Sequence, residues 1–112
     1  MEIIFTSGYN LDDDEITKGK GHRSDILLMD NHGNYYELNF VTINRLRSDL
    51  DYNFSNGKKY FTDICLIVLE EATKEQIISC VQDLYSFNYF KRFMPIENIE
   101  PNKNWVRIVL DQ

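Results

Sequence analysis

A continuous apolar run at residues 64–69, Ile-Cys-Leu-Ile-Val-Leu, constrains the fold more than any other segment. It has the length of a strand and no polar residue to face water, so it predicts a central strand covered on both faces of its sheet. The sequence Thr-Lys-Glu-Gln at 73–76 matches a capping box, which predicts that a helix begins there. The apolar residues that follow keep helical spacing up to Tyr85, so this helix is expected to end near residues 87–88.

The first half of the chain predicts a β-hairpin followed by another helix. Residues 24–30 and 35–41 are β-rich runs joined by Asn-His-Gly-Asn, whose Gly and Asn tolerate the positive φ of tight turns. Thr42 is a suitable N-cap for a helix over residues 43–55, in which four apolar residues recur at helical spacing. Asn-Gly directly after that segment is a typical helix stop signal.

The order of these elements predicts one α+β domain of two layers. Short strands are also expected near the two ends of the chain, at residues 2–6 and 105–110. The order β-ββ-α-β-α-β favours a mainly antiparallel sheet of about five strands with two helices on one face. The 112 residues suit a single domain, and residues 8–23, which lack an apolar period, are predicted to form a mobile loop.

Pleat alternation divides the run at 64–69 between the two faces of the sheet. The helix-covered face is assigned Ile64, Leu66 and Val68, which leaves Cys65, Ile67 and Leu69 on the second face, with Leu27 and Met29 beside them. Two helices in a two-layer fold cover only one face. The second apolar set therefore has to meet the 8–23 loop, the C-terminal tail, another copy of the chain or a different protein.

The charge balance argues against nucleic acid and membrane surfaces as partners. The chain has 12 Lys and Arg against 18 Asp and Glu, a formal net charge of −6, which repels phosphate backbones and anionic lipid. No apolar segment approaches the roughly 20 residues that span a bilayer, and the first residues do not resemble a signal peptide. Cys65 and Cys80 lie within apolar segments, as reduced thiols do, so a cytoplasmic location is expected.

Motifs that would indicate an enzyme are missing from the sequence. It contains no Gly-rich phosphate loop, CxxC, HExxH or GxSxG, so we expect no catalytic residue, no metal and no cofactor. His22 and His32 fall in predicted loops, where a solvated histidine is commoner than a metal ligand. Glu70 and Glu71 are expected to end the strand and favour the next helix through its macrodipole. A small enzyme or ligand-binding domain that uses these two acids is a further alternative.

The candidate binding residues are surface acids with one aromatic neighbour. An acidic run in the 8–23 loop lacks the spacing of an EF-hand, so it is interpreted as solvated or partner-facing charge rather than a metal site; it consists of Asp12, Asp13, Asp14 and Glu15. Asp49 and Asp51 fall on the polar side of the helix predicted at 43–55. Tyr52 beside them is a candidate anchor, because interface hot spots favour Tyr, Trp and Arg.

Several segments between residues 24 and 93 carry a family resemblance when they are taken together with size and acidity. They are the Asn-His-Gly-Asn turn, Phe40-Val41-Thr42, Val68-Leu69-Glu70-Glu71, Thr73-Lys74-Glu75-Gln76-Ile77 and Tyr89-Phe90. The chain resembles the small single-domain immunity proteins that accompany bacterial polymorphic toxins.

This resemblance implies that the chain binds a toxin domain made by the same cell and blocks its active site or a nearby surface. Nuclease toxins tend to be basic, so an acidic surface would speed association with a toxin of that kind. The alternative is a self-associating structural or regulatory domain without catalytic activity, a homodimer formed through the second face of the sheet.

Overall fold

The structure is a computed structural model that describes residues 1–8 and 20–110 of the chain. Its elements in chain order are β1 (Glu2–Phe5), β2 (His22–Met29), β3 (Tyr35–Thr42), α2 (Ile43–Ser55), β4 (Leu66–Leu69), α3 (Lys74–Ser86), the short 3₁₀ helix η1 (Tyr89–Arg92) and β5 (Val106–Val109). The strands form one five-stranded sheet in the order β4-β3-β2-β1-β5, with β3 and β4 parallel and the other pairs antiparallel. The predicted α+β class with a mainly antiparallel sheet is confirmed.

The two predicted helix N-caps and the predicted hairpin turn are present in the structure. The Thr42 hydroxyl accepts a hydrogen bond from the Arg45 backbone N–H at 3.3 Å, and Thr73 does the same for Gln76 at 3.4 Å. Each cap satisfies one of the backbone donors that a helix N-terminus leaves unpaired. The hairpin turn is closed by Asp30, whose Oδ1 accepts from the backbone N–H groups of His32 and Asn34.

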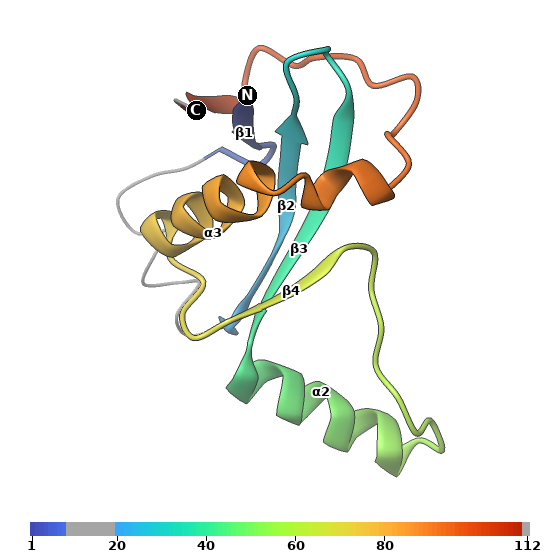
Figure 1. The fold of residues 1–112 in the computed structure, drawn as a ribbon. Coiled ribbons are helices and arrows are strands. Elements are labelled where there is room, and N and C mark those ends of the chain that lie inside the picture. The colour runs from blue at the N-terminus through green and yellow to red at the C-terminus, as the bar shows by residue number, and fades with distance from the viewer. Residues whose placement is uncertain (9–19, 111–112) are drawn as a thin grey trace.

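The main core lies between one face of the sheet and α3. Ile77 and Val81 of α3 are fully buried, and Phe90 of η1 is 3% exposed. In Figure 1, α3 and η1 lie across one face of the sheet as a second layer. The sheet residues buried against this layer include Ile3, Phe5, Ile26, Leu28, Leu38 and Phe40.

The position and orientation predicted for the apolar run at 64–69 are wrong. β4 is an edge strand rather than a central one, because among residues 1–8 and 20–110 it pairs only with β3. Its parallel register sets Ile67 beside Phe40, so Ile67 and Cys65 point toward α3 and are each 8% exposed. Ile64 and Val68, which were assigned to the helix-covered face, are 61% and 43% exposed. When every residue of a strand is apolar, alternation gives no phase, and the pairing partner alone decides which side faces the core.

The first helix also lies elsewhere than predicted. α2 was expected to share a face of the sheet with α3, but it leaves the end of the sheet and projects away from it (Figure 1). None of its residues is buried, and Ile43 and Phe54 are 57% and 54% exposed. Because β3 and β4 are parallel, α2 is the crossover between them, and such a helix ordinarily packs on its sheet. We call residues 43–64, which comprise α2 and most of the connector that follows it, the arm.

Of the predicted loop at 8–23, the structure describes residues 8 and 20–23. β2 begins at His22, so the last two residues of that prediction belong to a strand. Arg23 is 9% exposed, and its guanidinium forms an ion pair with Asp25 at 2.9 Å and lies 4.6 Å from the centre of the Phe5 ring. The acids Asp12, Asp13, Asp14 and Glu15 lie outside the described residues.

Candidate functional site

A polar groove of about 920 Å³ opens where α2 leaves the sheet. Its lining comprises Lys20, Gly21, Thr42, Asn44, Arg45, Ser48, Asp49, Tyr52, Glu70 and Glu71. The parallel pairing explains why these segments meet. Thr42 lies opposite Leu69 in the parallel register of β3 and β4, so the two strands finish at the same end of the sheet. α2 follows directly after β3 and Glu70-Glu71 directly after β4, so both start at that end. We call this feature the polar groove.

The charges of the polar groove are mixed, with an acidic excess. Among the described residues of the lining, Asp49, Glu70 and Glu71 supply three carboxylates against the two cations Lys20 and Arg45. Arg45 is fixed in place, because its Nε donates to Asp49 Oδ1 at 3.0 Å and its Nη1 donates to the Lys20 carbonyl at 2.9 Å. Glu70 and Glu71 are both exposed at the rim. The groove can therefore receive a cationic group of a partner at its Glu70–Glu71 side.

Tyr52 is 70% exposed, and of the described residues that line the polar groove it is the one with an aromatic side chain. Its ring offers apolar surface beside the carboxylates, which suits an interface anchor. The structure thus brings together two residues predicted from the sequence, Asp49 and Tyr52. Asp51 is exposed on the same helix but does not line the groove.

Glu70 and Glu71 are expected from the sequence mainly to end the strand and favour the next helix, and no local pattern shows their place in this groove. They come before Thr73, the N-cap of α3, while the first turn of that helix has its own acid, Glu75. What brings them beside Asp49 is the parallel pairing of β3 with β4, a contact between segments far apart in the chain. A prediction that these two strands pair in parallel would have placed both acids next to the start of α2.

A second, smaller pocket of about 340 Å³ lies between the arm and the sheet. It shares Arg45, Asp49 and Tyr52 with the polar groove and adds polar side chains of the sheet, among them His22 and Asn39. Asn39 is 5% exposed and donates through Nδ2 to the Ile64 carbonyl at 2.6 Å. His22 Nδ1 is buried and has no hydrogen-bond partner among the described residues. The residues that α2 contributes to this pocket are Arg45, Asp49, Tyr52 and Asn53, so the side of the helix that faces the sheet is largely polar.

The two cysteine thiols are poorly suited to nucleophilic chemistry. Burial raises the pKa of the Cys65 thiol to about 11 and also raises that of Cys80, so both thiols stay protonated at neutral pH and are weak nucleophiles. Within residues 1–8 and 20–110, no three His, Cys, Asp or Glu side chains are grouped closely enough to hold a metal ion. Over the same residues, neither α-helix has the length and apolar character needed to cross a bilayer.

Comparison of the chain with protein-family models, curated proteins and solved structures gave no match. The polar groove and the exposed arm are consequently the features from which a function is inferred.

Proposed function

We propose that this protein is an immunity-type inhibitor that binds a cognate bacterial toxin domain at the polar groove. The observation that supports this proposal is the convergence of three carboxylates and the exposed ring of Tyr52 in one open groove. The net charge of −6 adds a long-range attraction for a basic partner, which raises association rates and disfavours acidic competitors. A self-associating domain is the second candidate, and the exposed apolar residues of the arm favour it.

The groove suits a protruding Lys or Arg of a toxin. Such a side chain could place its charge beside Glu70 and Glu71 while its aliphatic stem packs on the Tyr52 ring. Asp51 extends the acidic surface along α2 beyond the groove. The acids at 12–15 would add to the field that steers a basic domain toward this protein. A toxin held in this way has its own basic surface covered, and inhibition follows if that surface binds its substrate.

The proposal is tested by capture and by protection of cells. The tagged protein is used to capture partners from a lysate of its native cells at low and high salt. Each captured protein is then expressed in a host with and without this chain, and cell survival is measured. We expect a basic protein that is lost at high salt, kills the host alone and is neutralised by this chain.

A pair of matched variants assigns the binding to the polar groove. Glu70→Gln with Glu71→Gln removes two negative charges at the groove, and Glu97→Gln with Glu100→Gln removes two from exposed positions in the tail before β5. We expect the groove pair to weaken toxin binding about tenfold or more and the tail pair to have a much smaller effect. Equal effects of the two pairs would contradict the site, and a captured set without any toxic protein would contradict the function.

A further inference from the structure

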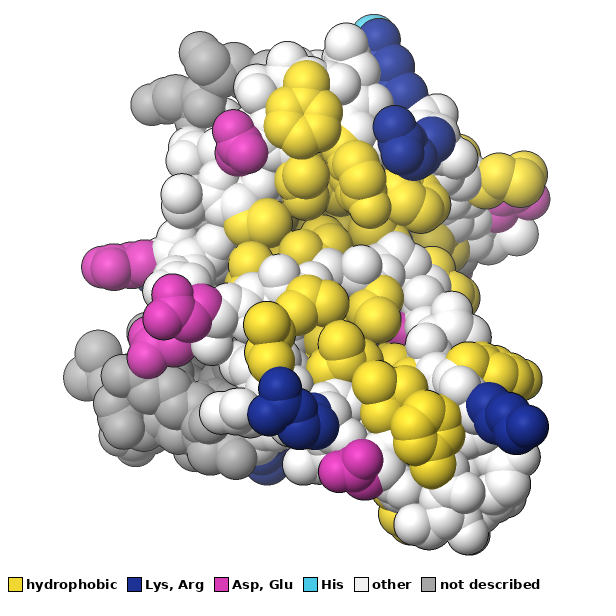
Figure 2. Space-filling view, turned by 60° about the horizontal axis from the view of Figure 1, so that its bottom comes forward, with side chains coloured by type: hydrophobic (Ala, Val, Ile, Leu, Met, Phe, Trp, Pro, Cys, Tyr) yellow, Lys and Arg dark blue, Asp and Glu magenta, His cyan; other side chains and the backbone are white. Residues whose placement is uncertain are grey.

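The helix of the arm, α2, is a crossover helix that lacks the packing on its sheet that crossover helices normally have. Its apolar residues at 43, 46, 50 and 54 follow helical spacing, which is the pattern of a helix that covers apolar surface. Yet α2 has no buried residue, and its sheet-facing side is lined by polar groups. Figure 2 shows hydrophobic side chains spread over this end of the molecule, from α2 up to the layer formed by α3 and η1. Within the part of the chain that the structure describes, Leu46 and Leu50 are therefore only partly covered, and the two ends of the stripe, Ile43 and Phe54, stay exposed.

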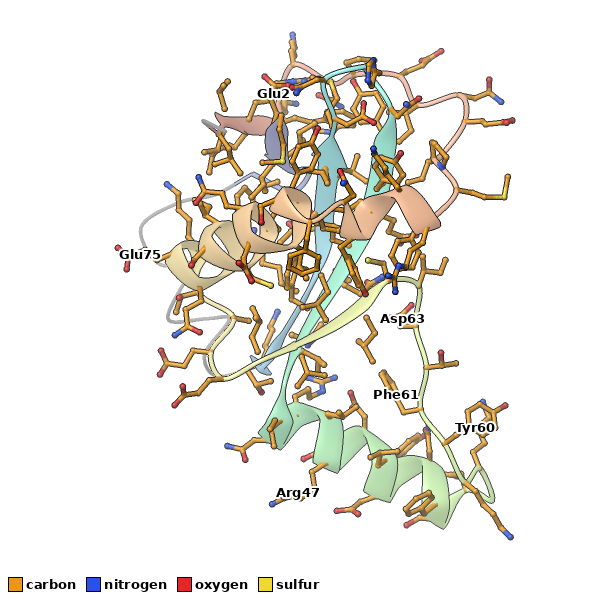
Figure 3. All side chains as sticks on the ribbon, in the orientation of Figure 1. Glu2, Arg47, Tyr60, Phe61, Asp63 and Glu75 are labelled. Carbon is orange, nitrogen blue, oxygen red and sulfur yellow. The ribbon has the colours of Figure 1, made fainter. Side chains whose placement is uncertain are left out.

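Besides Tyr52, which lines the polar groove, four large apolar residues of the arm are more than half exposed, and we call them the arm patch. They are Ile43, Phe54, Tyr60 and Ile64, with exposures of 57%, 54%, 63% and 61%. In Figure 3, Tyr60 lies on the outer side of the connector, whereas Phe61 points inward toward α2. Half-buried Phe61 therefore belongs to the inside of the arm, and Tyr60 extends its outer surface.

Summed over its four residues, the exposed area of the arm patch is comparable with the apolar share of one side of an interface. At roughly 200 Å² for a whole aromatic side chain, Phe54 and Tyr60 together expose about 230 Å², and the two isoleucines bring the total to on the order of 400 Å². A standard interface covers about 800 Å² on each partner, a little over half of it apolar. The arm patch supplies about that apolar share.

The charge of the arm indicates what covers it. Residues 43–64 carry four basic and three acidic side chains, a net charge of +1, while the rest of the chain carries eight basic and fifteen acidic ones, a net charge of −7. A basic toxin is attracted to the acidic remainder and to the polar groove, and not to the arm patch. Two copies that meet at their arms, in contrast, bring together the surfaces where their mutual repulsion is smallest, and both signs of charge are present to pair across the contact.

We propose that the arm is a dimerisation element and that two copies of this chain pack their arm patches against each other around a twofold axis. Such an isologous contact is the commonest arrangement of soluble oligomers. It leaves the polar groove open, because Arg45, Asp49 and Tyr52 form a stripe on the opposite side of α2 from Ile43 and Phe54. A dimer would thus present two grooves, and each could bind a toxin independently.

The test measures the mass of the purified full chain in solution, by light scattering after size exclusion and by sedimentation equilibrium, over a wide range of protein concentration. We expect the mass to rise toward twice that of the monomer. Ile43→Glu with Phe54→Glu should weaken the dimer about a hundredfold or more, since twofold symmetry places each change in the interface twice. Val109→Glu is the control, because Val109 is 70% exposed on β5, at the other edge of the sheet.

Salt separates this contact from toxin binding. Two copies that each carry −6 repel one another, so added salt should strengthen the dimer while it weakens the attraction of a basic toxin. Far-ultraviolet circular dichroism of each variant confirms that it is folded, as expected for positions already in contact with water. A monomeric mass at every concentration, or equal weakening by Val109→Glu, would overturn the proposal. If the chain is monomeric at every concentration and Ile43→Glu with Phe54→Glu abolishes toxin capture, the arm patch binds the toxin and not a second copy.

Discussion

Replacing Ile67 by Ala should cost far more stability than the same replacement at Ile64. Ile67 is 8% exposed and belongs to the core beneath α3, whereas Ile64, at the end of the arm, is 61% exposed. Both substitutions remove the same carbon atoms and leave the same residue, so their difference isolates burial. The sequence by itself favours the reverse order, because it assigns Ile64 to the helix-covered face.

The magnitudes follow from the buried fraction of each side chain. Ile→Ala in a packed core costs about 2–5 kcal/mol, made up of lost transfer free energy and a cavity, and Ile67 should fall near about 3 kcal/mol. Ile64 has about two-fifths of its surface covered, so its truncation should cost about 1 kcal/mol or less. At about 4 °C for each kcal/mol in a chain of this size, the two melting temperatures should differ by about 8 °C.

Urea unfolding of both variants, followed by far-ultraviolet circular dichroism at low protein concentration, measures the difference in the free energy of unfolding. Dilution matters because Ile64 belongs to the arm patch and a dimer would cover it. An unchanged slope with urea shows that only stability has changed. If Ile64→Ala is as costly as Ile67→Ala in the monomer, β4 does not face α3 as described.

Two further substitutions test local features of the structure. Gly21→Ala should destabilise the fold by about 2 kcal/mol, since φ is +73° and a Cβ would lie 2.7 Å from Thr42 Oγ1. Gly33→Ala, at φ +81° but in open space, should cost about 1 kcal/mol. Thermal unfolding compares the two variants, and a larger loss of stability at Gly33 would contradict the close approach at Gly21. For Asp25, burial raises the pKa, but the hydrogen bond and charge of Arg23, together with hydrogen bonds from the backbone of Asp25 and Ser7, more than offset this and leave the pKa below its usual value. The ion pair therefore stabilises the fold above the unfolded-state pKa of about 4 and loses that contribution as pH falls through the lower folded-state pKa. Asp25→Asn should cost about 1 kcal/mol in urea unfolding at neutral pH, because the carboxylate is screened by solvent, and less near pH ~3; an equal cost at both would refute the linkage.

The candidate site could be read from the sequence only where local pattern sufficed. Asp49 and Tyr52 fall on the polar side of an amphipathic helix, and both line the polar groove. Glu70 and Glu71 were visible as an acidic pair after a strand, but their place in the groove depends on the register of β3 with β4. That register is a pairing between distant segments, and residue patterns within either strand do not encode it.

The sequence by itself determined where the two α-helices begin and where the hairpin turns, because caps and turns depend on groups a few residues apart. Thr42, Thr73 and the Asn-His-Gly-Asn turn formed the two helix starts and the hairpin that they predicted. Tertiary structure alone decided that β4 lies at an edge, that Ile67 rather than Ile64 faces α3, and that α2 projects from the sheet. An all-apolar strand has no preferred face, and an amphipathic helix specifies only that some surface covers its apolar stripe. Contacts between distant parts of the chain decide which face of the strand is buried. For the arm patch, we propose that the covering surface is a second copy of the chain.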